Sequence, residues 1–375
     1  MQQNELTQEE KLQDEVLREA AVLLLEWFDG HARILPWREE VTPYRVWVSE
    51  IMLQQTRVEA VKPFFQRFTQ ALPNVEALAN CEEDRLLKLW EGLGYYNRVR
   101  NMQTAAKTVM QDYDGELPAD YQALLSLKGI GSYTAGAVAS IAYNLPVPAV
   151  DGNVLRVISR LLELYDDIMK DSVKKAMETR IRRIMPEDRP GAFNQALMEL
   201  GATVCVPNGP ARCEECPWQE LCQARKHGTI SELPVKAAKK KRRIEERTIL
   251  IISDGDRAAI CRRPDHGLLR GMYELPSLEG HLSQDEVLDY LRTQNFSPLH
   301  IRTLSEAKHI FSHVEWRMIG YQIRIEEPEE YEEKYLFVEP EETEKNYPIP
   351  AAFSAYVRYL DIRLGQEKYE EEQNK

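Results

Sequence analysis

The spacing of apolar positions predicts helices over most of the first 205 residues. In residues 5–29, apolar side chains recur every three or four positions, which is the period of an amphipathic helix with one buried face. Prolines and glycines divide the sequence that follows into short helical pieces. These are expected at Val46–Val61, Val75–Ala79, Glu82–Leu89, Arg98–Tyr113, Tyr121–Leu127, 153–165, 172–185 and Ala192–Val204.

Beyond residue 247 the pattern changes to that of strands. Thr248–Ile252 and Ala258–Arg262 lie on either side of Asp254-Gly255 and predict a hairpin. Further strands are expected at Arg317–Ile325 and Tyr335–Val338, and helices at Asp285–Thr293 and Ala351–Leu364. The pattern therefore predicts an all-α N-terminal part followed by an α+β C-terminal part.

Charge is distributed unevenly along the chain, whose formal net charge is -13. Residues 231–250 sum to +4, and six of the eight residues from Lys236 to Arg243 are basic. Because this run lacks an apolar period, it predicts a linker between domains. Residues 251–375 sum to -10, with ten Glu in 326–344, a composition typical of solvated surface. The net charge therefore does not exclude DNA as a partner, since the basic charge is local.

Composition excludes several classes of protein. The longest aliphatic run is Ala20–Leu25, whereas a membrane-spanning helix needs about 20 apolar residues. The polar, acidic start is unlike a secretory signal. Six cysteines in a chain of this length do not form a disulfide scaffold. We expect no membrane association and a cytoplasmic location.

The string Leu127-Lys128-Gly129-Ile130-Gly131-Ser132-Tyr133 predicts a tight hairpin between two helices. Gly129 and Gly131 would let the backbone approach a partner closely. The free amides at the start of the second helix would suit a phosphate. This is the helix-hairpin-helix pattern, which binds the DNA backbone without reading sequence. An ordinary turn between helices would produce the same string.

Two carboxyl groups are candidates for acid–base chemistry. Glu50 lies in an otherwise apolar helical stretch, where partial burial would raise its pKa and keep it protonated, as a general acid requires. Asp151 follows the hairpin by about 20 residues and precedes a helix. A Glu on the wet side of a helix and an Asp that caps one are the simpler explanations. The spacing from the hairpin favours a functional role for Asp151.

Four cysteines, separated by gaps of seven, two and five residues, predict a metal site. Zinc prefers paired short knuckles, so the unequal gaps favour a [4Fe–4S] cluster. The proposed ligands are Cys205, Cys213, Cys216 and Cys222.

Together these motifs resemble the endonuclease III superfamily of DNA glycosylases. Ser49–Thr56 and the C-terminal part narrow the resemblance to the MutY-type adenine DNA glycosylases, over roughly residues 30–365. The resemblance implies a multidomain protein. Its expected parts are a helical catalytic region at 1–230 with a six-helix barrel and an iron–sulfur cluster module, a basic linker at 231–247, a Nudix-like lesion-recognition domain at 248–365 and an acidic tail at 366–375. The family's first cysteine gap is usually six residues, one fewer than here.

The activity implied by the resemblance is removal of adenine mispaired with 8-oxoguanine or guanine, after the adenine is flipped out of the duplex. Glu50 would protonate adenine N7 and then help to activate water. Asp151 would stabilise the oxocarbenium-like sugar, electrostatically or through a covalent intermediate. Tyr133 and Asn153 would position these groups.

The resemblance also implies residues that contact DNA. Arg38 and Gln195 would contact the flipped base, and Gly129 and Gly131 a phosphate, with a cation that could join them. Gln55 and Tyr95 would wedge beside the estranged guanine, although Tyr95 could equally be packed in the core. The lesion-reading loop would be Phe311, Ser312 and His313, in which Ser312 bonds the altered edge of 8-oxoguanine; a strand-edge Ser-His without a role is the alternative.

Two differences from related enzymes argue against strand cleavage and against nucleotide hydrolysis. Lyases of the superfamily use a Lys amine at the position of Tyr133, and a phenol cannot form an imine, so we expect no efficient strand cleavage. In the C-terminal part, Gly280 and Glu286 match the first interval of the Nudix hydrolase motif, but position 294 is Gln and no acid pair follows. That part is therefore expected to read the lesion rather than hydrolyse nucleotides.

The expected protein is a monomer that acts on double-stranded DNA at the nucleoid of a bacterium. Two other kinds of protein share some of these motifs. A thymine-specific mismatch glycosylase or a bifunctional lyase is disfavoured by the Nudix-like part and by Tyr133, respectively. A non-catalytic iron–sulfur DNA-binding protein is disfavoured because both Glu50 and Asp151 are present.

Overall fold

The computed structural model describes residues 7–237, 241–327 and 332–365. They divide into two compact units. The first unit contains the residues up to Ala79 and those from Asn101 to 237, and the second contains Asn80–Arg100 and the residues from 241 onward. The expected acidic tail at 366–375 and part of the expected linker, 238–240, lie outside the described residues.

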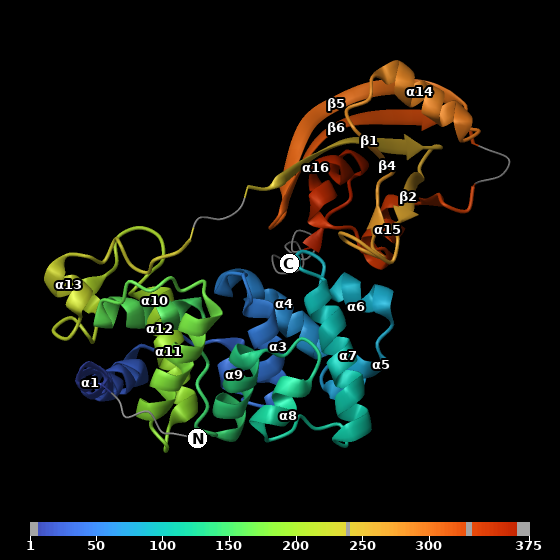
Figure 1. Ribbon diagram of the computed structural model, residues 1–375. Coiled ribbons are helices and arrows are strands. Elements are labelled where there is room, and N and C mark those ends of the chain that lie inside the picture. The colour runs from blue at the N-terminus through green and yellow to red at the C-terminus, as the bar shows by residue number, and fades with distance from the viewer. Residues whose placement is uncertain (1–6, 238–240, 328–331, 366–375) are drawn as a thin grey trace. The chain divides into compact units, whose positions relative to one another are not determined.

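The N-terminal region is helical, as predicted (Figure 1). Its helices are α1 (Gln8–His31), α2 (Pro36–Glu39), α3 (Pro43–Leu53), α4 (Val58–Ala71), α5 (Val75–Asn80), α6 (Glu83–Leu89), α7 (Asn97–Asp112), α8 (Tyr121–Ser126), α9 (Ser132–Tyr143), α10 (Gly152–Leu162), α11 (Asp171–Ile184), α12 (Pro190–Thr203), η1 (Cys213–Glu215) and α13 (Gln223–His227).

The prediction of one helix at Val46–Val61 was wrong. The chain leaves α3 after Leu53 and enters α4 at Val58, because Gln55 takes a left-handed backbone conformation with φ 58°. Pro63, which was expected to separate helices, lies inside α4. The break places Gln54 and Gln55 on a short loop rather than on a helical face.

Two features hold the first unit together. Helices α1, α10, α11 and α12 share one hydrophobic core, which includes Leu24, Ile158 and Leu197. Helix α9 packs closely against the segment before α10, where a Cβ on Gly136 would lie 2.1 Å from the carbonyl oxygen of Pro148. This close approach fixes the start of α9 relative to the start of α10.

The second unit is built on a mixed sheet with the strand order β3-β2-β1-β6-β5. Its strands are β1 (Arg243–Ser253), β2 (Ala258–Arg262), β3 (Tyr273–Glu274), β4 (Ser277–Glu279), β5 (Pro298–Ile310), β6 (Val314–Ile325) and β7 (Leu336–Val338). Strand β1 is parallel to β6 and antiparallel to β2, which confirms the expected β1–β2 hairpin. Strand β1 begins at Arg243, so the last residues of the range expected as a linker belong to the sheet.

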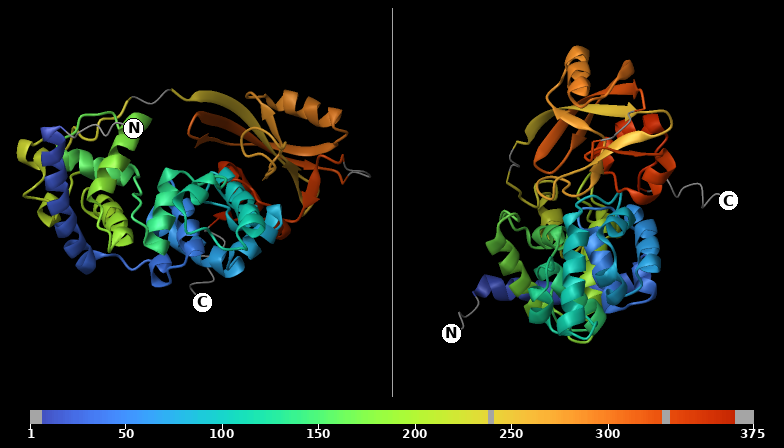
Figure 2. Two further views of the ribbon diagram at one scale, coloured as in Figure 1. Left: turned by 60° about the horizontal axis from the view of Figure 1, so that its bottom comes forward. Right: turned by 90° about the vertical axis from the view of Figure 1, so that its right-hand side faces the viewer.

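Helices cover both faces of this sheet (Figures 1 and 2). Along β1, Ile249 and Ile251 face a core shared with α16 (Ser354–Val357), while Leu250 and Ile252 face α14 (Gln284–Thr293). The remaining elements are α15 (Pro340–Asn346), η2 (Ala351–Phe353) and η3 (Arg358–Leu360). The single helix predicted at Ala351–Leu364 is therefore wrong, because η2, α16 and η3 divide that stretch.

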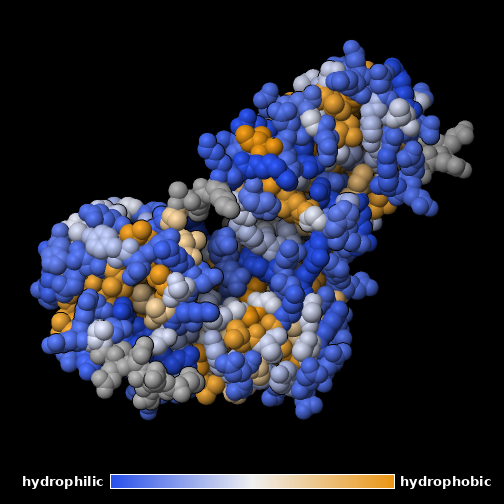
Figure 3. Space-filling model, viewed as in Figure 1, coloured by the Kyte–Doolittle hydropathy of each residue, from blue (hydrophilic) through white to orange (hydrophobic). Residues whose placement is uncertain are grey.

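The face of the molecule in Figure 3 is largely hydrophilic, with apolar residues in separate patches. Among the described residues, no helix has the length and apolar character needed to cross a membrane.

Candidate active site

A cavity of about 1030 Å³ in the first unit brings together eight of the candidate catalytic and DNA-binding residues. It lies where α2, α3, α9, α10 and α12 converge. The expected site residues that line it are Arg38, Glu50, Gln55, Gly131, Tyr133, Asp151, Asn153 and Gln195. Residues more than 100 positions apart in the sequence therefore share one concave surface.

Glu50 is an acid buried in the wall of the cavity. It sits in α3 with only 5% of its surface exposed, so it does not lie on the wet side of the helix. Burial raises the pKa of Glu50 to about 7, and the nearby charge of Asp151 adds to the rise. The hydroxyl of Tyr133 donates a hydrogen bond to Glu50 and, like the charge of Arg38, opposes it. A carboxyl with this pKa retains its proton in a large fraction of molecules at neutral pH.

Asp151 is both the N-cap of α10 and a wall of the cavity. Its carboxylate accepts hydrogen bonds from the backbone N–H groups of Asn153 and Val154, both at 2.8 Å, and from Asn153 Nδ2 at 2.7 Å. Burial raises the pKa of Asp151, and these donors oppose the rise because they stabilise the ionised form. The capping explanation is therefore correct, and the same side chain also lines the cavity.

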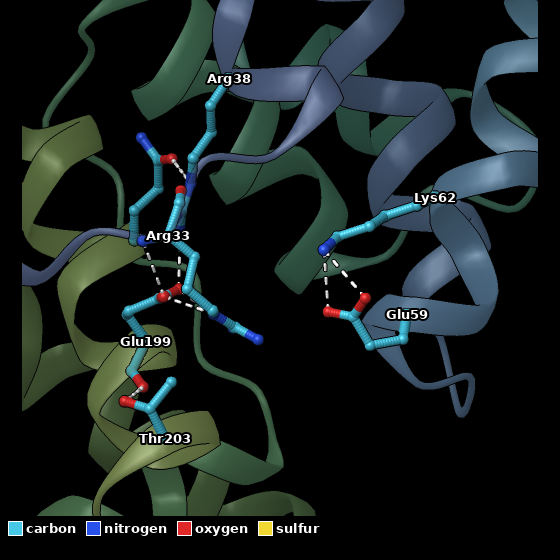
Figure 4. Close-up of polar contacts among 7 residues, drawn as sticks. Arg33, Arg38, Glu59, Lys62, Glu199 and Thr203 are labelled. Atoms are coloured by element: carbon cyan, nitrogen blue, oxygen red, sulfur yellow. Dashed lines mark hydrogen bonds and ion pairs between the residues drawn. The ribbon is translucent and has the colours of Figure 1, made fainter.

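A network of two arginines and one glutamate forms another part of the wall (Figure 4). Glu199, 1% exposed, accepts hydrogen bonds from Arg33 Nε at 2.5 Å and from Arg38 Nη2 at 3.0 Å. Arg38 Nε in turn donates to Gln195 Oε1 at 2.9 Å. Although burial opposes it, bonds and charge from Arg33 and Arg38 keep the pKa of Glu199 below its ordinary value.

Sequence reasoning found Arg38 and Gln195 but missed Arg33 and Glu199. The signal for Glu199 was its position one helical turn after Gln195, which places both side chains on one face of α12. Arg33 lies in the loop after α1, where no periodicity marks it.

The helix-hairpin-helix turn joins α8 to α9, as predicted. Gly129 has φ 80°, and a Cβ there would lie 2.6 Å from Asn101 Cβ, so this glycine allows a tight turn against α7. Gly129 does not line the cavity. Gly131 does, and apart from its two chain neighbours no residue has an atom within 4 Å of the position where its Cβ would be. The open side of the turn at Gly131 leaves room for a ligand at the start of α9.

The four candidate metal ligands line a second, small cavity of about 20 Å³ beside α10 and α12. Burial raises the pKa of Cys216 to about 12, and the other three cysteines, as negative neighbours, add to the rise. Arg160 Nη1 lies 3.3 Å from Cys205 Sγ. In the part of the chain that is described, no group of three or more His, Cys, Asp or Glu is arranged so that it could hold a metal ion as it stands. The donor set itself fits a thiolate-bound cation, because four crowded thiolates repel one another unless a positive charge lies between them.

The remaining candidates belong to the second unit. Phe311, Ser312 and His313 form the turn between β5 and β6, where Ser312 and His313 are exposed. Phe311 packs edge-on against Trp316, with 5.0 Å between the ring centroids. Tyr95 is 48% exposed rather than packed in a core. The turn thus exposes the polar side chains of Ser312 and His313, while the packed ring of Phe311 holds the turn in place.

Comparisons with known proteins identify the family of both parts of the chain. Residues 48–183 match the family model of HhH-GPD superfamily base excision DNA repair proteins, and residues 247–359 match the NUDIX domain. An adenine DNA glycosylase of Mus musculus is 34% identical in an alignment that covers 81% of this chain and 70% of the mouse protein. One from Buchnera aphidicola is 33% identical and covers 78% of this chain and 82% of its own length.

A solved structure supports the fold of the first unit. A thermostable thymine-DNA glycosylase is 27% identical, with a TM-score of 0.51, and covers 58% of this chain and 98% of its own. The chain belongs to the adenine DNA glycosylase family and is a DNA glycosylase with a helix-hairpin-helix region and a Nudix-like domain.

Proposed function

We propose that this protein removes adenine mispaired with 8-oxoguanine, and also with guanine, from double-stranded DNA by hydrolysing the N-glycosidic bond. The observation that carries the proposal is one cavity that contains a buried acid with a pKa of about 7 and a second carboxyl group held by three N–H donors. Glycoside hydrolysis uses such a pair, one protonated and one ionised.

In the proposed mechanism, Glu50 is the general acid and Asp151 the electrostatic partner of the sugar. The adenine enters the cavity after flipping from the duplex, at an unstacking cost of a few kcal/mol. Glu50 gives its proton to adenine N7, so that the base leaves as a neutral molecule. Asp151 faces the positive charge that develops on the sugar, and Glu50, now ionised, helps to take a proton from the attacking water. Tyr133 and Asn153 hold the two carboxyl groups by the hydrogen bonds described above.

The same site disfavours strand cleavage. A lyase needs an amine that attacks the sugar carbon, and Tyr133 presents a hydroxyl already bonded to Glu50. Lys174, Lys175 and Lys236 line the cavity on other elements, where we assign them to DNA phosphates. Gly131 and the amides at the start of α9 would bind a further phosphate, with a cation between them.

Opposite the adenine, the turn between β5 and β6 would read the lesion. The N7 of 8-oxoguanine carries a hydrogen that guanine lacks, and the exposed Ser312 hydroxyl can accept a hydrogen bond from it. Gln55 and Tyr95 would occupy the space that the flipped base leaves. Both residues have positive φ values, 58° and 50°, and both are exposed.

Four thiolates, from Cys205, Cys213, Cys216 and Cys222, would hold a [4Fe–4S] cluster with a structural role. Closure of these ligands around the cluster requires the loop from 205 to 222 to adjust. The seven-residue first gap supplies one residue more than the usual family spacing for that adjustment.

Single-turnover base release from duplexes with A:8-oxoG, A:G and T:G pairs tests the proposal. We expect adenine release, fastest opposite 8-oxoguanine, with strand breaks only after alkali. Preferential thymine release, or prompt strand breaks, would contradict it. The Ser312→Ala variant should lose part of the preference for A:8-oxoG over A:G, and an unchanged preference would remove the proposed role of Ser312.

A further inference from the structure

A buried ion pair fastens helix α6 and the loop after it to the C-terminal end of the described chain. Lys88 Nζ lies 3.0 Å from Glu91 Oε1, and the two residues are 9% and 1% exposed. Lys88 also donates to the main-chain carbonyls of Thr343 and Tyr347, at 3.3 and 2.8 Å. Glu91 therefore has a charged partner that is itself held by a segment about 250 residues away in the sequence.

The carboxylate of Glu91 completes the connection. Its Oε1 accepts a hydrogen bond from Ile349 N at 3.0 Å, and its Oε2 accepts one from Gly365 N at 3.3 Å. The pair thus contacts four main-chain groups between Thr343 and Gly365. Main-chain partners fix the register of the segment in a way that apolar packing alone would not, since hydrogen bonds are directional.

Two further contacts join residues 80–100 to another segment of the Nudix-like domain. Arg100 Nη2 donates to the carbonyl of Arg270 at 2.7 Å, and Tyr273 donates its hydroxyl to Asp84 Oδ2 at 3.5 Å. Residues 80–100 lie within the range that matches the HhH-GPD family, yet their contacts group them with the Nudix-like domain.

The loop that follows the ion pair is built to present Tyr95. Gly92, Gly94 and Tyr95 all have positive φ, at 101°, 67° and 50°. Arg98 Nη2 donates to the carbonyls of Leu93 and Gly94, at 3.0 and 3.1 Å. Its guanidinium also lies 5.6 Å from the centroid of the Tyr95 ring. This backbone conformation costs a non-glycine residue free energy and persists only where its surroundings impose it, so the contacts of the loop hold Tyr95 in place.

We propose that Lys88 and Glu91 are positioning residues for lesion recognition. They hold the Tyr95 loop and the turn Phe311–His313 in one rigid body. Insertion of Tyr95 into the base stack is therefore coupled to recognition of 8-oxoguanine. This inference rests on the function proposed above, because it needs Tyr95 to contact DNA and Ser312 to read the lesion. Neither Lys88 nor Glu91 touches the base or the sugar in this proposal.

Replacement of both residues tests the inference, because apolar side chains can fill the site of a buried ion pair without unfolding the protein. In Lys88→Met/Glu91→Leu, we expect a cooperative melting transition, and a preference for A:8-oxoG over A:G reduced about tenfold in single-turnover base release. In the Ser312→Ala background the same double replacement should change the preference by less than about twofold, because the two changes act on one step. Arg363→Gln is the matched control, since Arg363 pairs with Glu344 in the same C-terminal segment and should leave the preference unchanged.

The outcomes separate this inference from the proposed function. If the wild-type protein shows no preference for adenine opposite 8-oxoguanine, the proposed function is wrong. If the wild type shows it and the double variant keeps it, or if the effects of the double variant and Ser312→Ala multiply, the positioning role is wrong. Should the double variant fail to fold, Glu91→Gln is tested by the same measurement, the preference for A:8-oxoG over A:G. Its amide oxygen can still accept from Ile349 N, so we expect an intermediate loss of that preference.

Discussion

Glu50 and Asp151 show how the surroundings of two carboxyl groups assign different tasks to them. Three N–H donors reach Asp151, whereas the donor described for Glu50 is the hydroxyl of Tyr133. Donors stabilise the ionised form, so Asp151 is suited to remain an anion and Glu50 to carry a proton. The sequence indicated both residues and the burial of Glu50. It could not show the donor count, which depends on side chains from α3, α9 and α10 meeting in space.

The Glu50→Gln variant should gain stability relative to the wild type as pH rises. In the folded protein the pKa of Glu50 is about 7, against 4.5 without burial. Below about pH 4.5 both states are protonated and the pKa difference has no effect. Between the two values only the unfolded chain ionises, so the wild type loses stability up to about pH 7, by about 3 kcal/mol.

Urea unfolding at acid and alkaline pH measures this effect. The variant should exceed the wild type at alkaline pH and match it at acid pH. The control Glu59→Gln, at an exposed position, should show no such trend. A difference between Glu50→Gln and wild type that does not change with pH would contradict the assignment.

Asp151→Asn should separate catalysis from folding. Asn is as good an N-cap as Asp and can still accept from the N–H groups of residues 153 and 154, but its NH2 group cannot accept from Asn153 Nδ2, so the free energy of unfolding should fall by no more than about 2 kcal/mol. Adenine release should fall on the order of 100-fold or more because the negative charge is lost. Gel-shift binding of lesion DNA should persist. Loss of binding together with a lowered melting temperature would identify Asp151 as a structural residue only.

Among the helices and strands, the sequence predicted those whose position depends on a local pattern of residues. Apolar periodicity located most of the helices, and the residues around Asp254-Gly255 located the β1–β2 hairpin. Strand β5 was missed because it lies at the sheet edge and most of its side chains are exposed, so no alternation marks it. The break between α3 and α4 depends on the backbone of Gln55, which propensity does not reveal.

Gly136→Ala should disrupt the packing of α9. The new Cβ would lie 2.1 Å from the Pro148 carbonyl oxygen, which is backbone and cannot swing away. We expect a loss of about 3 kcal/mol or more in the free energy of unfolding. Gly30→Ala is the control, since nothing lies within 4 Å of its added Cβ and Ala favours a helix. Equal stability of the two variants would show that α9 can shift without cost.

The cysteine loop should bind iron when the protein is produced and purified without oxygen. We expect about four iron atoms per chain and visible absorption, both lost in Cys213→Ser, because a [4Fe–4S] cluster needs its thiolate ligands. Chelation should lower the melting temperature of the wild type without a comparable effect on Cys213→Ser. Stoichiometric zinc in place of iron would contradict the cluster assignment.

The two units of the molecule are defined by which residues contact one another, and they do not coincide with two continuous stretches of sequence. Residues 80–100 join the Nudix-like domain through Lys88 and Glu91, whose partners are about 250 or more positions away. A sequence pattern is local, so it could indicate two domains but could not assign this segment. The net charge of -13 likewise does not indicate the binding partner, because the groups expected to contact DNA are hairpin amides and a few basic side chains.

The pH dependence of single-turnover adenine release from an A:8-oxoG duplex tests directly whether Glu50 is the general acid. Since the proposed general acid is the protonated form of Glu50, the rate constant should be highest on the acid side and fall as pH rises past about 7. Glu50→Gln, which carries no titrating proton, should lose the rate at every pH. A wild-type rate constant that stays level between about pH 6 and about pH 9, or a Glu50→Gln variant as fast as the wild type, would show that Glu50 is not the general acid.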